Sequence, residues 1–97
     1  MEYSPPPTDK EFNLNVLNGK MFIKAVFGKV LSRDEMIRVL KNKFKIANNN
    51  LTGLTVSQLT EVLAKKLLKH KYCSIKEGFS LNNLRMEGIN VHKEISL

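Results

Sequence analysis

Residues 31–36 have the sequence LSRDEM, and residues 54–59 return to the same type of sequence as LTVSQL. In each stretch a hydroxyl residue precedes a Glu or a Gln by three positions, which is the sequence of a capping box at a helix N-terminus. An apolar residue stands before each box and another follows it, and such a pair favours a hydrophobic staple. The two stretches therefore predict two helices that begin at Ser32 and Thr55.

Apolar residues recur at helical spacing after both boxes. In the first helix they continue to about Phe44, with charged and amide residues on the opposite side. In the second helix they form one stripe, which consists of Val56, Leu59, Leu63 and Leu67. The polar residues 45–53 (KIANNNLTG) supply turn-forming asparagines and a glycine, so we expect them to connect the two helices.

Residues 12–26 show a period of two around Asn18-Gly19, a pair that is typical of a type I′ hairpin turn. The pattern predicts an N-terminal β-hairpin with one continuously apolar face. Its second face also carries apolar side chains, namely Leu17, Phe22 and Val26. We expect a partner surface, such as a second copy of the chain, or one of the helices to cover that face.

The C-terminal third predicts further strands. Residues 72–81 favour a hairpin around Lys76-Glu77-Gly78, and a turn at Glu87-Gly88 would join residues 84–86 to residues 89–91. Residues 80–85 are also compatible with the start of a short helix. The expected order is ββααββ(β), a single α+β domain over residues 11–97 that follows a flexible proline-rich tail over residues 1–10.

Residues 32–82, two capped helices and a hairpin, resemble a winged helix-turn-helix in their order of elements. The resemblance implies that the second helix and the hairpin face DNA. The connector between the helices is longer than the tight turn of a standard helix-turn-helix.

Positive charge is concentrated in one part of the chain. Sixteen Lys and Arg oppose nine Asp and Glu, which gives a net charge of +7. Between residues 41 and 71 there are seven lysines and one acid, Glu61. Such a concentration suits an anionic partner, either nucleic acid, DNA or RNA, or an acidic protein surface. The expected nucleic-acid-binding residues are Lys41, Lys43, Lys45, Lys65, Lys69, Lys71 and Lys76.

Two functions from different classes follow from these patterns. The first is a small nucleic-acid-binding protein with weak sequence specificity, because the basic cluster contains no arginine to read guanine. The second is a non-enzymatic interaction subunit, a homodimer or part of a complex, that uses Leu17, Phe22 and Val26. Phe22 between Lys20 and Lys24 also suggests a small single-strand stacking platform.

The sequence offers little for catalysis or for cofactors. His70 is expected to cap the second helix, and Cys73 to point inward as a small hydrophobic residue. No nucleophile with its base, no glycine-rich phosphate loop and no zinc motif is present, so we expect neither an enzyme nor a metal or cofactor site. One cysteine, no leader-like segment and no long apolar run favour an intracellular protein that does not enter a membrane.

Overall fold

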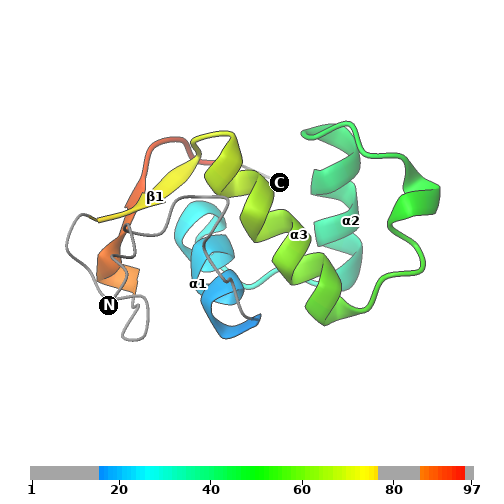
Figure 1. The fold of residues 1–97 in the computed structure, drawn as a ribbon, viewed down its shortest axis with the longest axis horizontal. Coiled ribbons are helices and arrows are strands. Elements are labelled where there is room, and N and C mark those ends of the chain that lie inside the picture. Colours follow the sequence, from blue (N-terminus) through cyan, green and yellow to red (C-terminus); the bar gives the residue numbers. More distant parts are fainter. Residues whose placement is uncertain (1–15, 77–85, 96–97) are drawn as a thin grey trace, which may run out of the picture.

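The computed structural model describes residues 16–76 and 86–95. It is a small α+β domain with three helices and a two-stranded antiparallel sheet, shown in Figure 1. The predicted tail over residues 1–10 lies outside the described residues. In chain order the elements are α1 (Val16–Phe27), α2 (Arg33–Asn42), a 3-10 turn (Asn48–Asn50), α3 (Val56–Lys69), β1 (Cys73–Ile75), a 3-10 turn (Met86–Gly88) and β2 (Ile89–Val91).

Helix α3 lies between α1 and α2 and packs against both of them (Figure 1). Its apolar side chains Leu59, Leu63 and Leu67 are fully buried, as the predicted stripe requires, whereas Val56 is 48% exposed. The buried hydroxyl of Thr60 donates to the carbonyl of Val56 at 2.8 Å, and this hydrogen bond offsets the cost of removing the hydroxyl from water. The same hydroxyl lies 3.7 Å from the sulfur of Met36 on α2.

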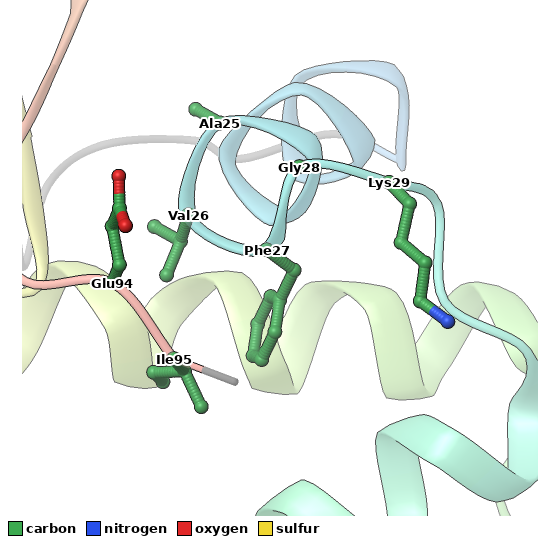
Figure 2. A pocket seen from close by; sticks show the side chains of 7 residues that line it. All are labelled: Ala25, Val26, Phe27, Gly28, Lys29, Glu94 and Ile95. Atoms are coloured by element: carbon green, nitrogen blue, oxygen red, sulfur yellow. The ribbon is translucent and has the colours of Figure 1, made fainter. Parts of the chain in front are cut away.

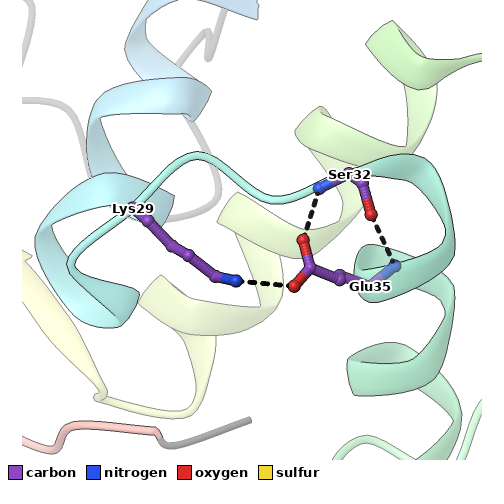
Figure 3. A network of polar contacts seen from close by, with 3 residues as sticks. All are labelled: Lys29, Ser32 and Glu35. Atoms are coloured by element: carbon purple, nitrogen blue, oxygen red, sulfur yellow. Dashed lines mark hydrogen bonds and ion pairs between the residues drawn. The ribbon is translucent and has the colours of Figure 1, made fainter.

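Both predicted capping boxes are confirmed. The Ser32 hydroxyl accepts from the Glu35 backbone N–H at 3.3 Å, and the Glu35 carboxylate accepts from the Ser32 N–H at 2.9 Å (Figure 3). The corresponding distances for Thr55 and Gln58 are 3.1 and 2.9 Å. Arg33 links the two helix starts, because its guanidinium donates to carbonyls of the loop that precedes α3.

The predicted N-terminal hairpin is wrong over residues 16–26, which form helix α1. Gly19 does not adopt the positive φ of a type I′ turn. A Cβ on Gly19 would lie 3.0 Å from Thr60 Cγ2 and 3.5 Å from Ala64 Cβ, so the glycine permits a close approach of α1 to α3. Phe22, Ile23 and Val26 share one buried helix face with Gly19, at a period of 3.6 rather than two.

Strand β1 is present where the second hairpin was expected, but its observed partner is different. It pairs with β2 in the register Cys73 to Val91 and Ile75 to Ile89. The expected pairing with residues 79–81 and the possible helix at 80–85 lie outside the described residues. The predicted hairpin turn at Glu87-Gly88 is wrong, because Met86–Gly88 forms a 3-10 turn that leads into β2.

Candidate nucleic-acid interface

A pocket of about 330 Å³ opens beyond the C-terminal ends of α2 and α3. We call it the basic aromatic pocket, and its lining consists of Lys43, Phe44, Lys45, His70, Tyr72 and Lys93. Two tripeptides supply most of these residues, KFK after α2 and HKY after α3. Segments that are remote in sequence thus meet around one cavity.

Backbone hydrogen bonds explain how Lys93 reaches the pocket. The segment after β2 folds back on the residue before β1, because the N–H groups of His92 and Lys93 both donate to the carbonyl of Tyr72 at 2.8 and 3.2 Å. The Lys93 ammonium then lies 5.3 Å from the centroid of the Tyr72 ring, a cation–π distance. Beside Tyr72, Ser74 Oγ lies 2.7 Å from His92 Nε2. This hydrogen bond also holds the segment after β2 against β1.

Three rings form one wall of the basic aromatic pocket. The Phe44 centroid lies 5.3 Å from that of His70, with the ring planes tilted by 42°. It lies 5.7 Å from the Tyr72 centroid in an edge-to-face arrangement. Phe44 and Tyr72 are half-buried and pack against the core, whereas His70 is exposed at the C-cap of α3. The core therefore holds two of the rings while part of each faces outward.

Two lysines with left-handed backbone flank this wall. Lys45 has a φ of 57° and Lys71 a φ of 62°. At Lys71 the conformation closes a Schellman motif, since the Tyr72 N–H donates to Leu67 O at 2.9 Å and the Lys71 N–H to Leu68 O at 3.2 Å. Glycine is the usual residue at such positions, because a Cβ makes left-handed backbone unfavourable.

The electrostatics of the basic aromatic pocket are positive. Lys43, Lys45 and Lys93 line it, no carboxylate among the described residues does so, and within that part of the chain none of the three forms an ion pair. Each is exposed. Other lysines occupy the last turns of the helices, Lys41 in α2 and Lys66 and Lys69 in α3, where they offset the partial negative charge of the helix ends.

The structure gathers part of the predicted basic cluster. Lys43 and Lys45 line the pocket, while five predicted residues lie exposed outside its lining: Lys41, Lys65, Lys69, Lys71 and Lys76. The sequence predicts no binding role for four of the lining residues: Phe44, His70, Tyr72 and Lys93. A local signal was available for the first three, the alternation of rings and cations directly after each helix, but no local pattern marks Lys93.

Two of the three residues of the predicted partner surface, Phe22 and Val26, are buried inside the domain. Phe22 is 0% and Val26 2% exposed, because both lie on the face of α1 that packs on α3. The internal alternative is therefore the observed one, and Phe22 cannot serve as a stacking platform. The side chain of Leu17 is not among the described ones. Cys73 is buried, as expected.

A second pocket, of about 440 Å³, lies between the end of α1 and the C-terminal segment (Figure 2). The Phe27 ring and the Ile95 side chain extend into this space, with Lys29 and Glu94 at its two sides. Lys29 is already engaged, since its ammonium donates to the Glu35 carboxylate at 2.7 Å (Figure 3). This pocket thus offers a ligand less unpaired charge than the basic aromatic pocket does.

In the described part of the chain, no set of three or more His, Cys, Asp or Glu side chains is placed to hold a metal ion. Among the same residues, no helix combines the length and the apolar character needed to cross a membrane. Comparison of the chain with models of known protein families, with curated proteins and with solved structures gives no match.

Proposed function

We propose that this protein binds nucleic acid through the basic aromatic pocket, with an affinity that is set mainly by charge. The lining of that pocket carries the proposal. Three exposed lysines line it, two from the segment after α2 and one from the segment after β2, and no described carboxylate does so. Phosphates along a nucleic acid backbone match such a set, because each contact releases a condensed counterion.

The absence of arginine from the pocket lining supports weak sequence specificity. Arginine reads guanine through two parallel hydrogen bonds, whereas lysine acts as a point charge toward phosphate. Binding of this kind is expected to be micromolar at low salt and to fall steeply as salt is added.

The exposed lysines outside the pocket extend the proposed surface. Lys65 and Lys69 lie one turn apart on α3, and Lys71 and Lys76 follow that helix. In the fold, β1 follows α3 but pairs with β2, so the hairpin over residues 72–81 on which the winged-helix resemblance rests is not the observed sheet. These lysines would contact further phosphates of the same nucleic acid strand outside the pocket.

A salt titration tests the proposal. Binding of fluorescently labelled DNA and RNA is measured by anisotropy from about 50 mM salt upward. The paired substitution Lys43→Glu with Lys45→Glu is expected to reduce affinity at least about tenfold and to lower the salt slope by about two units. Lys20→Glu with Lys24→Glu is the matched control, since it changes the same charge at two exposed positions of α1.

The outcomes separate the two classes of partner. No binding of either nucleic acid near 50 mM salt would contradict the proposal. Equal losses in the pocket pair and in the control pair would mean that net charge matters and the pocket does not. Binding of poly-glutamate without binding of nucleic acid would favour an acidic protein surface instead.

A further inference from the structure

Charge alone does not account for the composition of the basic aromatic pocket. A surface that only attracts phosphate needs cations, and the remaining lining residues are all aromatic: Phe44, His70 and Tyr72. Side chains of this type are large and lose little conformational entropy on binding, so they suit a flat, apolar ligand group. A nucleobase is the flat group that nucleic acid carries beside its phosphates.

The rings are preorganised. Phe44 contacts both other rings, at centroid distances of 5.3 and 5.7 Å, and it packs with Tyr72 against the buried core. The Lys93 ammonium sits over the Tyr72 ring, which fixes a cation beside an aromatic surface. A ligand that binds here meets positions already set by the fold, which reduces the entropy lost on binding.

The backbone around the rings also favours a binding role. Lys45 follows Phe44, and Lys71 stands between His70 and Tyr72, both in the left-handed conformation that glycine adopts more easily. Backbone strain of this kind concentrates at ligand sites, where it holds side chains in place at a cost in stability. Both segments that present the rings carry such a residue.

We infer that the basic aromatic pocket holds an unpaired nucleobase against its ring wall, and hence that the ligand is single-stranded nucleic acid. The adjacent phosphates lie on Lys43, Lys45 and Lys93. The inference rests on the proposed function and narrows it to one class of nucleic acid. In a duplex the bases remain stacked on one another, so the rings would gain no contact.

The cavity has a size that fits this role. Its volume of about 330 Å³ is at the lower end of the range of roughly 300 to 1,000 Å³ that small-ligand pockets occupy. A single nucleotide is therefore a better match than a longer stretch of chain. Because every base has a flat aromatic face, we expect stacking here to tolerate any sequence.

The test compares three oligonucleotides of one length. They are oligo-dT, the same strand paired with its complement, and an abasic strand that keeps the sugars and phosphates. The wild-type protein is expected to bind oligo-dT roughly tenfold more tightly than the abasic strand, because base–aromatic stacking supplies the difference. It is also expected to bind oligo-dT more tightly than the duplex.

Substitutions of the rings show whether the preference for oligo-dT over the abasic strand arises in the basic aromatic pocket. Tyr72→Leu and Phe44→Leu are each expected to remove most of the preference for oligo-dT while leaving affinity for the abasic strand within about twofold. Phe27→Leu is the matched control, since Phe27 is a half-buried ring outside this pocket. Circular dichroism establishes that each variant is folded before binding is measured.

A second measurement needs no change to the pocket. The chain has two tyrosines and no tryptophan, so Tyr3→Phe leaves Tyr72 as the remaining tyrosine fluorophore. Stacking on a base is expected to quench its emission when oligo-dT is added, and the abasic strand at equal occupancy is expected to leave the emission nearly unchanged.

Each outcome decides between the two proposals. Equal affinity for all three oligonucleotides, or tighter binding of the duplex, would overturn the single-strand inference and leave charge-driven binding intact. Unchanged Tyr72 emission on saturation with oligo-dT would overturn it as well. Failure to bind any of the three, or RNA of the same length, at low salt would overturn the proposed function itself.

Discussion

In both α2 and α3, the N-terminal end and the C-terminal end differ in how the backbone is stabilised, and the two helices show the same difference. Both begin with a complete capping box, in which a hydroxyl and a Glu or Gln side chain satisfy backbone N–H groups at 2.9 to 3.3 Å. After both ends comes a lysine with left-handed backbone, and beside each of these lysines stands an aromatic residue that lines the basic aromatic pocket. At the starts the side chains form capping hydrogen bonds, whereas at the ends Lys45 and Lys71 adopt a backbone conformation that glycine adopts more easily.

This contrast separates side chains that stabilise the helices from side chains that the local backbone does not require. Interactions at the starts satisfy groups that would otherwise be unpaired, and each contributes to the free energy of unfolding. At the ends, glycine adopts left-handed backbone at a lower free energy than Lys45 or Lys71 does, and under the proposed function the Lys45 side chain would bind phosphate. Substitutions at the starts and at the ends should therefore have effects of opposite kind.

The largest expected effect is at the starts. Ser32→Ala and Thr55→Ala each remove the hydroxyl that accepts an N–H bond, and each is expected to lower the free energy of unfolding by about 1 kcal/mol. The double variant should lose about 2 kcal/mol, measured by urea unfolding. Oligonucleotide affinity of the folded variants should stay at the wild-type level.

Ser57→Ala is the control for the caps. Ser57 is an exposed serine in the first turn of α3 that takes no part in either box, so the change should be near zero or slightly stabilising. Losses within error for both cap variants would contradict the assignment of stability to the starts. A loss of oligonucleotide binding in the folded double variant would contradict the separation of the two ends.

At the C-terminal ends, in contrast, a substitution should raise the free energy of unfolding. Lys45→Gly relieves the left-handed strain at φ 57°, worth about 1 to 2 kcal/mol, and adds about 0.5 to 1 kcal/mol of backbone entropy to the unfolded chain. We expect a net gain of about 0.5 to 1 kcal/mol in the free energy of unfolding. The same change removes a pocket ammonium, so nucleic acid affinity should fall.

Lys45→Asn separates strain from charge, because asparagine tolerates left-handed backbone but has no ammonium group. Its affinity should match that of Lys45→Gly, with a smaller gain in stability. If Lys45→Gly destabilised the protein and left binding unchanged, Lys45 would be a structural residue and the contrast between the helix ends would fail.

The helix starts could be predicted from the sequence, whereas the pocket at the helix ends could not. A capping box joins residues three positions apart, so both starts are visible in the printed order of residues and both are confirmed. The basic aromatic pocket brings residues 43–45, 70–72 and 93 together through tertiary folding. Lys93 takes its position from hydrogen bonds to Tyr72, which no local pattern encodes.

Helix α1 shows how a tertiary contact decides between two periodicities. Residues 16–26 fit a period of two on either side of Asn18-Gly19 and also a period of 3.6 through Gly19, Phe22, Ile23 and Val26. The turn propensity of Asn-Gly favours the first pattern. Close packing of Gly19 on Thr60 and Ala64 of α3 favours the second, and both of these residues lie more than 40 positions further along the chain.

The smallest expected effect is a pH dependence of stability, which the capping box of α2 should show and that of α3 should not. The hydrogen bond from Lys29, followed by that from the Ser32 backbone, lowers the pKa of Glu35 from 4.5 to about 2. Gln58 holds the equivalent position in the second box and does not titrate. A carboxyl group with a lowered pKa takes up its proton at higher pH in the unfolded state, so its contribution to stability is present above about 4.5 and is lost as the pH falls to about 2.

Glu35→Gln should therefore flatten the decline of the melting temperature between about pH 4.5 and pH 2, because Gln keeps the capping bond but cannot be protonated there. At neutral pH the variant should melt slightly below the wild type, since the bond to Lys29 loses its charge. Gln58→Glu is the reciprocal change and should make the decline steeper, because it introduces a titrating carboxylate into the second box. Parallel melting profiles for all three proteins across this range would mean that the Lys29–Glu35 pair adds nothing to the start of α2 and that the two capping boxes are equivalent.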